Sequence, residues 1–452
     1  MNTSRNPSIH GQWSSRMAFI LAATGSAVGL GNIWKFPYEA GQNGGGAFII
    51  TYIICVMLIG LPIMVAEILI GRRGRESPIG SLSHLARESH SSSFWGGIGA
   101  VGMLAGLIIL SFYSVIAGWA IAYTGYAATG ELVNIDKNAA NSLFTALISN
   151  PLKLLILHTL FLSITFSIVA RGVSNGLEKL ATYGMPLLFA LLLLLVGYAV
   201  IVGDFSAAFH YLLYPDFSRI NGSTLLTAMG QAFFSLSLGM GALMVYGAFL
   251  PDDVSIGRSA MMVGAADTLV AIMAGFAVFP IVMAHQIEPG QGPGLIFQSL
   301  PLAFSAMPFG QLFATLFFSL VVLAALTSAV SLVEPSVTWL VEKYEARRSA
   351  SAFLVGISCW ILGIGSLLSF NLWSNKTWLN RTFFDWMDHL TSNIMLPLGG
   401  LGIAVFCGWI MHSSHSKDEL QGHNHLAYPI WRFLIRYIAP LAVLIIFVSS
   451  II

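Results

Sequence analysis

The chain has 452 residues, of which 56% are hydrophobic and only 9% are charged, and its formal net charge is +1. Long apolar runs recur from end to end, so this composition excludes a water-soluble protein and predicts a polytopic membrane protein, for which we expect no nucleic-acid partner. The cysteines Cys55, Cys359 and Cys407 all fall inside apolar runs. We therefore expect neither a disulfide framework nor a cysteine-based metal site.

Eleven apolar runs are long enough to cross a bilayer as helices, which takes about 20 residues each. We place the spans at 15–38, 46–71, 94–128, 151–170, 176–202, 223–250, 259–287, 309–343, 350–369, 384–411 and 428–450. Most lysine and arginine residues fall in loops that share one side of the membrane with the N-terminus. The positive-inside rule then predicts a multi-pass protein of the inner cell membrane with a cytoplasmic N-terminus.

Three glycines and an amide interrupt the first span between Thr24 and Asn32. Glycine costs a helix interior roughly 1 kcal/mol relative to alanine. Lipid offers no water to backbone groups that a helix releases, so irregular backbone persists at membrane depth only where it lines a cavity. We predict a break near 27–32 whose free amides and carbonyls hold a ligand and ions. By itself, the spacing of Gly25 and Gly29 is also typical of close helix packing.

A second glycine-rich interruption follows Gln231 in the sixth span, over 233–241. Two interrupted helices, each the first of a group of five spans, indicate an internal repeat. Five spans leave the chain on the opposite side of the membrane, so the second copy is inverted relative to the first. The breaks would meet near the bilayer midplane, where half-helix N-termini attract a carboxylate and C-termini attract cations. The predicted parts are a cytoplasmic segment 1–14, a first repeat 15–202, an external loop 203–222, a second repeat 223–411, a cytoplasmic loop 412–427 and an eleventh helix 428–452.

Three motifs carry a family resemblance. They are Gly-Ser-Ala-Val-Gly-Leu-Gly-Asn-Ile-Trp-Lys-Phe-Pro-Tyr over 25–38, Asn-Gly-Gly-Gly-Ala-Phe over 43–48 and Phe-Phe-Ser-Leu-Ser-Leu-Gly-Met-Gly over 233–241. The sequence resembles the neurotransmitter:sodium symporter family, in its bacterial amino-acid branch of eleven spans, from Trp13 to about Trp409. The resemblance implies an all-α integral membrane fold of two inverted five-helix repeats with discontinuous first and sixth helices, plus an eleventh transmembrane helix. It also implies a sodium-coupled secondary active symporter, not an enzyme.

Two sodium sites are implied by the resemblance, both built from oxygen ligands, which a hard cation prefers. One would take the Ala27 carbonyl, the side chains of Asn32, Ser235 and Asp267, and the substrate carboxylate. The other would take the carbonyls of Gly25, Val28 and Ala324 with the hydroxyls of Thr327 and Ser328. Read without the two breaks, these hydroxyls would more often bond to their own helix.

Asp267 stands where chloride-dependent members of the family carry asparagine. An ionisable group at membrane depth costs about 2.5 to 3.5 kcal/mol on insertion scales and is usually functional. The chloride of those members lies among residues whose counterparts here look like Tyr52, Gln231, Ser235, Asp267 and Ala271. Ala271 stands where those members have a serine, and the Asp267 carboxylate stands where they have an amide, so we expect no chloride requirement. The other interpretation is a structural carboxylate paired with a neighbouring hydroxyl.

The implied substrate is a neutral hydrophobic L-amino acid, aliphatic to aromatic. Its carboxylate would bind the amides of Leu30 and Gly31 and the Tyr113 hydroxyl, and its ammonium would bind the carbonyls of Ala27, Phe234 and Ser235 with the Ser237 hydroxyl. Its side chain would contact Ile109, Tyr113, Phe234, Met240, Ser328 and Leu332. Gly29 stands where monoamine carriers have an aspartate, which favours a zwitterion. Met240 replaces a phenylalanine of leucine-selective relatives, which leaves room for large side chains.

Gates are implied at both ends of this pocket. The external gate would be Lys35 with Asp388, and the rings of Phe234 and Tyr113 would close over the substrate, although a lysine there would also snorkel to the interface without a partner. The internal gate would be His10 opposite Glu342, with Trp13 beside them. His10 stands where the family has arginine, and a histidine titrates near neutral pH.

A proton-coupled amino-acid carrier of the same architecture is the alternative, because Asp267 and Glu67 are both ionisable groups inside spans. We expect Glu67 to bind freed amides of the first helix instead. A receptor would need a large signalling domain, and an intramembrane enzyme would need a nucleophile with a base or a metal cluster. The loops are too short for a signalling domain, and the spans show neither a Ser-His pairing nor a His/Glu ligand spacing. The expected partners are therefore the amino acid, sodium and the lipid bilayer.

Overall fold

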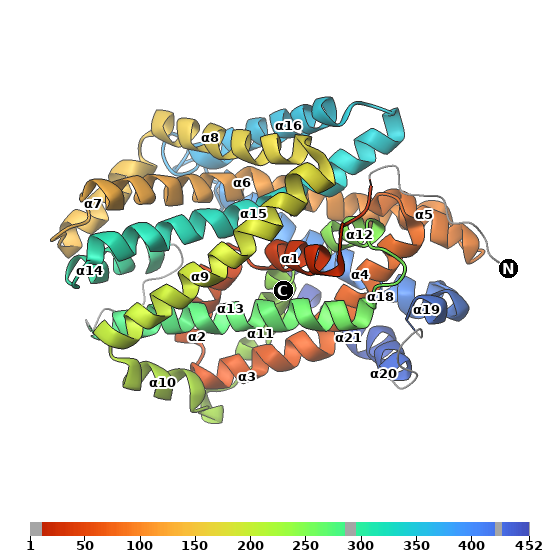
Figure 1. Ribbon diagram of the computed structural model, residues 1–452, viewed down its shortest axis with the longest axis horizontal. Coiled ribbons are helices and arrows are strands. Elements are labelled where there is room, and N and C mark those ends of the chain that lie inside the picture. Colours follow the sequence, from red (N-terminus) through yellow and green to blue (C-terminus); the bar gives the residue numbers. More distant parts are fainter. Residues whose placement is uncertain (1–10, 285–294, 421–426, 452) are drawn as a thin grey trace.

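Helices form nearly all the regular structure of the computed structural model, which describes residues 11–284, 295–420 and 427–451 (Figure 1). In these residues the exception is an isolated β-bridge between Trp378 and Arg381. The helices of the first half are α1 (Arg16–Ala27), α2 (Phe36–Gln42), α3 (Gly46–Cys55), α4 (Leu61–Gly74), α5 (Pro78–Glu88), α6 (Gly96–Thr129), α7 (Lys137–Ile148), α8 (Pro151–Ala170), α9 (Glu178–Val202) and α10 (Phe205–Leu213). The all-α fold class is confirmed.

The second half of the chain is also helical. Its helices are α11 (Gly222–Ser235), α12 (Ala242–Ala248), α13 (Ile256–Ala284), α14 (Leu300–Ser305), α15 (Gly310–Tyr344), α16 (Arg348–Leu368), α17 (Phe383–Asp388), α18 (Leu396–Val405), α19 (Ser413–Leu420), α20 (Ala427–Phe433) and α21 (Ala439–Ile451). Single π-helical turns join several of them, at Gly31–Lys35, Val56–Gly60, Val173–Leu177, Leu295–Ser299, His389–Met395, Phe406–Ile410 and Leu434–Ile438.

The predicted spans coincide with these helices. Within the described ranges, nine helices are long and apolar enough to cross a membrane, and the bent pair Arg16–Ala27 and Gly31–Gln42 makes a tenth. The predicted sixth span is occupied by α11 and α12, two shorter helices separated by residues 236–241. The connecting loops carry further short helices, α5, α7, α10 and α19.

Both predicted breaks are present. The chain bends by 55° after α1, where Val28 adopts an extended conformation. In the second break Ser237, Gly239 and Gly241 have positive φ angles of 54°, 81° and 77°. A β-carbon added at Gly239 would lie 2.6 Å from the carbonyl oxygen of Leu396, so only glycine fits both the dihedral and the space.

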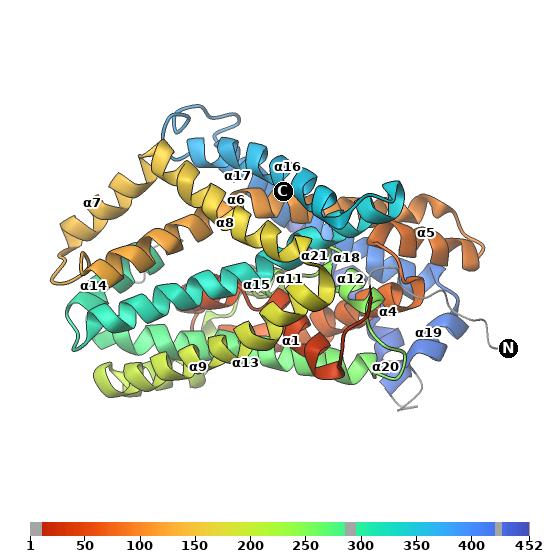
Figure 2. The same ribbon diagram turned by 45° about the horizontal axis from the view of Figure 1, so that its top comes forward.

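The broken helices lie inside the bundle. The helix α1 packs against α9, α13 and α15, while α12 packs against α4 and α15 packs along α6. Figures 1 and 2 show α1 surrounded by longer helices, with α5 and α19 at one end of the bundle and α7 and α14 at the other. We call the latter the vestibule end. Two large clusters of buried apolar side chains, one around α4 and α12 and one around α6 and α15, meet at the breaks.

Candidate functional site

A buried carboxylate connects the two breaks. Asp267, on α13, has no solvent exposure. Its Oδ1 accepts a hydrogen bond of 2.7 Å from Asn32 Nδ2, and its Oδ2 accepts bonds of 3.0 Å from the Tyr52 hydroxyl and 2.9 Å from the Ser235 hydroxyl. Asn32 follows the first break and Ser235 precedes the second. Three donors therefore hold one negative charge where the two irregular segments meet.

A second group of oxygens lies where α1 ends against α15. The Ser328 hydroxyl donates to the carbonyl oxygens of Val28, at 3.0 Å, and Gly25, at 3.3 Å. The Thr327 hydroxyl bonds to its own helix, 3.0 Å from the Ala324 carbonyl oxygen. The structure thus brings together all five residues expected at the second sodium site. The Thr327 hydroxyl therefore bonds within its own helix, whereas the Ser328 hydroxyl bonds across to carbonyls at the C-terminal end of α1.

The donor chemistry fits a hard cation. Among the described residues, no group of three or more His, Cys, Asp or Glu side chains is placed to hold a metal ion. The two clusters consist of main-chain carbonyls, hydroxyls, one amide and one carboxylate. Oxygen sets of this kind, with a single full negative charge, suit a small hard cation far better than a transition metal.

All eleven residues expected to contact the substrate line one cavity between the breaks. They are Ala27, Leu30, Gly31, Ile109, Tyr113, Phe234, Ser235, Ser237, Met240, Ser328 and Leu332, and the same cavity also touches Ser26 and Gly29. The Leu30 amide donates to the Tyr113 hydroxyl at 3.3 Å. The cavity measures about 30 Å³, so side chains around it must move before an amino acid enters. Met240 is the most flexible of them.

Sequence reasoning missed Ser26 as a lining residue. Its carbonyl accepts a hydrogen bond of 2.8 Å from the Ser237 hydroxyl, and its own hydroxyl bonds to Ser331 at 2.8 Å. These contacts join the first break to the second and to α15. The sequence does show a serine inside the glycine-rich run. Its position in the run alone does not tell which side of the helix the serine side chain faces.

Gly29 is required by space. A β-carbon at this position would lie 2.5 Å from the Ser328 hydroxyl oxygen and 3.2 Å from the Tyr113 hydroxyl oxygen. Ser328 is a member of the second oxygen cluster, so any larger residue at Gly29 disturbs both the cavity and that cluster. An aspartate, as in monoamine carriers, would not fit this arrangement.

The expectation for Glu67 is corrected. Glu67 is fully buried on α4, and its Oε1 accepts a hydrogen bond of 2.7 Å from the Gly239 amide. In the described residues it therefore satisfies a freed amide of the second break, not of the first. Gly239 lies between the end of α11 and the start of α12, so its amide is outside the hydrogen-bond pattern of either helix.

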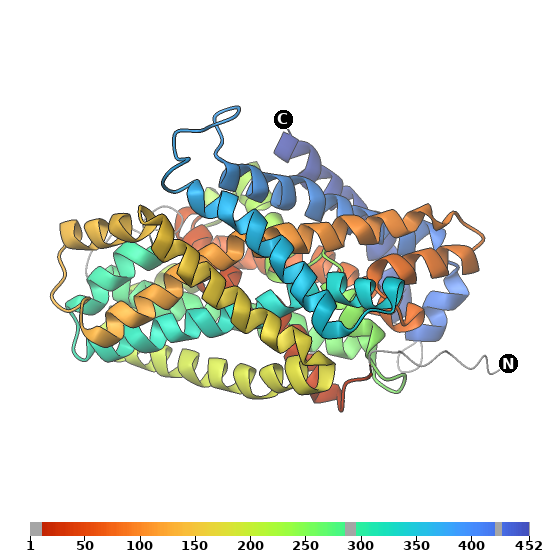
Figure 3. The same cartoon turned by 90° about the horizontal axis from the view of Figure 1, so that it is seen from above.

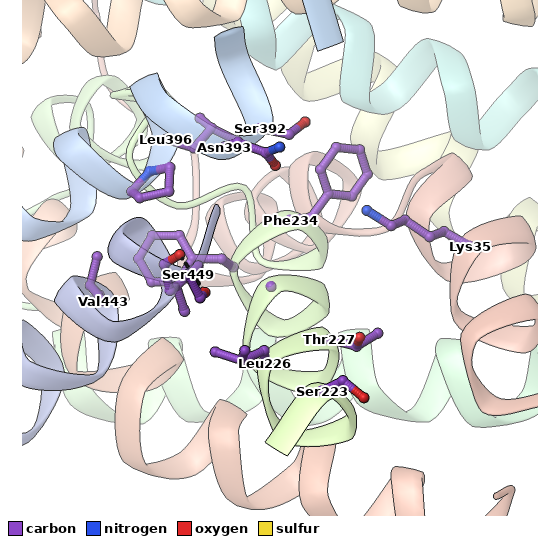
Figure 4. A pocket seen from close by; sticks show the side chains of 14 residues that line it. Lys35, Ser223, Leu226, Thr227, Phe234, Ser392, Asn393, Leu396, Val443 and Ser449 are labelled. Carbon is purple, nitrogen blue, oxygen red and sulfur yellow. Dashed lines mark hydrogen bonds between the residues drawn. The ribbon is translucent and has the colours of Figure 1, made fainter. Parts of the chain in front are cut away.

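Phe234 separates the cavity from a larger hollow at the vestibule end. This outer hollow of about 320 Å³ is lined from α11, the π-turn before α18, and α21, and it includes Lys35, Phe234, Ser392 and Asn393 (Figure 4). The Lys35 ammonium lies 4.8 Å from the centre of the Phe234 ring. Asp388 instead accepts a bond of 2.9 Å from the Ser392 hydroxyl, and no ion pair in the described part of the chain joins it to Lys35.

The opposite end is closed by Trp13, which is 2% exposed. Its indole Nε1 donates to the Tyr246 carbonyl at 2.9 Å, and its amide donates to the Phe249 carbonyl at 3.1 Å. Glu342 accepts bonds of 2.8 and 2.9 Å from the Ser77 amide. His10, the expected partner of Glu342, lies outside the described residues. The N-terminal segment is thus fastened to α12 by Trp13.

Comparisons with known proteins agree with this geometry. A family model described as the sodium:neurotransmitter symporter family matches residues 10–143 and 144–452. The uncharacterised sodium-dependent transporter YhdH of Bacillus subtilis is 36% identical over 443 residues, with 97% of each chain covered, and one of Haemophilus influenzae is 34% identical over 446 residues, with the same coverage.

A solved structure extends the likeness to three dimensions. The crystal structure of MhsT in complex with L-phenylalanine is similar to this chain with a TM-score of 0.90 and 41% sequence identity, over 97% of this chain and 99% of that one. The family model, the full-length relatives and the broken-helix fold agree. The chain therefore belongs to the sodium:neurotransmitter symporter family, and it is a sodium-dependent membrane symporter.

Proposed function

We propose that this symporter uses the sodium gradient to import a neutral hydrophobic L-amino acid, aliphatic to aromatic, by alternating access and without chloride. The observation that carries the proposal is the cavity between the breaks, in which main-chain dipoles and hydroxyls adjoin an apolar wall. Such a site matches a zwitterion with an apolar side chain. MhsT, whose structure was solved with L-phenylalanine, supports the same substrate class.

Coupling arises from shared ligands. A sodium ion among Asn32, Ser235 and Asp267 would lie next to the Ala27 carbonyl, at the wall of the substrate cavity. A substrate carboxylate in that cavity would complete the sodium shell, so each ligand raises the affinity for the other by the same factor. A second sodium at Val28 and Ser328 touches no substrate and would hold α1 against α15.

Asp267 carries the proposed chloride independence. It accepts bonds from Tyr52 and Ser235, two of the groups that chloride would contact, so a fixed anion already stands beside the proposed sodium site. The names of relatives also differ in whether they mention chloride. A canine relative, 28% identical over 411 residues, is named a sodium- and chloride-dependent taurine transporter, whereas the bacterial relatives are named sodium-dependent transporters.

The proposal is tested with purified protein in liposomes. An inward sodium gradient should drive accumulation of radiolabelled L-phenylalanine and L-leucine, with gluconate in place of chloride making no difference. Choline in place of sodium should abolish accumulation. Uptake driven by a pH gradient in sodium-free buffer would contradict sodium coupling, and a requirement for chloride would contradict the role of Asp267.

Met240→Phe should narrow the substrate range. Met240 is buried in the cavity wall, and a rigid ring there adds volume to a space that is already small. Overpacking costs about 1 to 3 kcal/mol, so we expect L-phenylalanine and L-tryptophan to bind about tenfold more weakly, with L-leucine much less affected. Competition binding across these amino acids measures the change. Met240→Leu, which keeps the volume, should leave the order of affinities as in the wild type.

Tyr113→Phe should weaken recognition of the substrate carboxylate. The Tyr113 hydroxyl lies 3.3 Å from the Leu30 amide, at the edge of the break. A hydrogen bond to a charged group contributes about 1.5 to 3 kcal/mol, so L-phenylalanine should bind about tenfold more weakly. Tyr123→Phe is the matched control, because the Tyr123 hydroxyl is buried on the same helix without a hydrogen-bond partner in the described structure. Equal losses in both variants would contradict a role in carboxylate binding.

A further inference from the structure

An open hollow lies where the loop between α16 and α17 meets α17. We call it the aromatic hollow. It measures about 520 Å³ and is lined by Trp373, Lys376, Trp378, Arg381, Phe383, Trp386, Met387 and Leu390. Figures 2 and 3 show this loop projecting from the margin of the bundle, at the end of α16. It shares no lining residue with the outer hollow or the substrate cavity.

The hollow has a fixed shape. Trp378 and Arg381 pair through two main-chain hydrogen bonds of 2.9 and 3.1 Å, which close a tight turn whose middle residues both have positive φ. The Trp386 indole donates to the Trp378 carbonyl at 2.8 Å, and the two indole rings lie 4.8 Å apart. These contacts hold the turn against α17, so the wall exists before anything binds.

Its charge is entirely positive. The Arg381 guanidinium lies 5.2 Å from the Trp386 ring centre, and the Lys376 ammonium lies 5.7 Å from that of Trp373. None of the eight lining residues is acidic. The nearby Asp385 accepts bonds from the amide and hydroxyl of Thr382, where it caps α17. A ligand of this hollow is therefore an anion with a large apolar part.

The position of the hollow points to lipid. On α16 the apolar residues Phe353, Ile357 and Ile361, four positions apart and 39% to 72% exposed, form a face open to the surroundings of the bundle. Leu372, just beyond the end of α16, is 69% exposed. Tryptophan, lysine and arginine at the end of such a face are typical of the level of the lipid headgroups. A small free anion would contact only the two basic side chains, whereas an anionic lipid would contact both these side chains and the apolar wall.

We propose that the aromatic hollow binds an anionic phospholipid of the outer leaflet. Its phosphate would lie between Lys376 and Arg381, which suits phosphate recognition by a guanidinium and an ammonium. Its acyl chains would run over Phe383, Met387 and Leu390 toward the exposed face of α16. Since α17 leads directly into the π-turn that lines the outer hollow, the lipid would brace the element behind Ser392 and Asn393.

Native mass spectrometry tests this site. Wild-type protein is exchanged into equal amounts of phosphatidylglycerol and phosphatidylcholine and should retain phosphatidylglycerol preferentially. Lys376→Gln and Arg381→Gln should each lower that retention about fivefold, as expected for one basic residue at an anionic lipid surface. Lys137→Gln removes an exposed positive charge at the same end but outside the hollow, and it should retain lipid as the wild type does.

Two further readouts make the test decisive. Added phosphatidylglycerol should raise the unfolding temperature of the wild type but not of the double variant, while sodium-dependent L-phenylalanine binding stays intact in both. Equal retention of the two lipids, or undiminished phosphatidylglycerol retention in the double variant, would overturn the proposal. Displacement of the lipid by L-phenylalanine would also overturn it, since the hollow would then serve the substrate.

Discussion

Asp267→Asn is expected to reduce chloride-free uptake of L-phenylalanine by at least about 100-fold. The carboxylate accepts three hydrogen bonds at the meeting point of the breaks and provides the only full negative charge that the described protein residues bring to the proposed first sodium site. Removing one partner of a buried charge pair costs about 3 to 5 kcal/mol, which corresponds to a factor of 100 or more. Initial uptake rates in gluconate buffer, with sodium varied at fixed substrate, measure this loss.

Chloride should partly rescue the variant, because an asparagine leaves the tyrosine and serine donors of Asp267 free for an anion. Asp267→Asn combined with Ala271→Ser introduces both residues that the family resemblance assigns to chloride-dependent members, and it should show the larger chloride stimulation. Ala271→Ser alone keeps the carboxylate and should remain insensitive to chloride. Full chloride-free activity of Asp267→Asn would show that the carboxylate is structural.

Loss of the two hydroxyls at the α1–α15 contact should raise the sodium concentration needed for half-maximal uptake. Ser328 bridges to the carbonyls of Gly25 and Val28, and Thr327 stands beside it on the same helix. Each hydrogen bond or ligand bond to a charged group contributes about 1.5 to 3 kcal/mol, so Thr327→Ala with Ser328→Ala should shift the sodium dependence by about 100-fold. Substrate binding at saturating sodium should change far less.

The matched control removes the same two hydroxyl types from α15 elsewhere. Thr315 bonds to its own helix through the Gln311 carbonyl, at 2.8 Å, and Ser319 is a half-buried serine on the same helix outside the substrate cavity. Thr315→Ala with Ser319→Ala should leave the sodium dependence within about threefold of the wild type, as for uncharged hydrogen bonds. Equal shifts in the two double variants would remove the second sodium site from the account.

The breaks were predictable because their cause is local. Glycine is costly in a helix and lipid cannot solvate free amides, so a glycine-rich run inside a span already indicates irregular backbone that lines a cavity. The structure places the bend after Ala27 and positive φ angles at Gly239 and Gly241, inside the predicted segments. Asp267 on α13 and Ser328 on α15 reach the first break through tertiary packing.

Contacts set by side-chain direction were not predictable. Glu67 binds the second break instead of the first, because the packing of α4 against α12 decides which freed amide lies within its reach. Lys35 lies over the Phe234 ring, while Asp388 accepts a bond from Ser392, one turn along its own segment. Long polar side chains have several partners within reach, and tertiary packing selects among them.

The aromatic hollow could not be predicted from the sequence either. Its tryptophans are spread over 14 residues of a loop with no helical or strand periodicity, and its turn is made by Leu379 and Asn380, not by a glycine that would have marked it. Positive φ angles at such residues are uncommon. Only the folded chain shows that the rings and the two cations share one surface.

Equilibrium binding of radiolabelled L-phenylalanine to the purified protein tests the account most directly. Binding should be saturable, should require sodium with choline as the control, and should be unaffected when gluconate replaces chloride. Gly29→Ala, which brings a methyl group against Ser328, should abolish it. Equal affinity in sodium and choline, or undiminished binding by Gly29→Ala, would show that the two broken helices do not hold the amino acid and its sodium together.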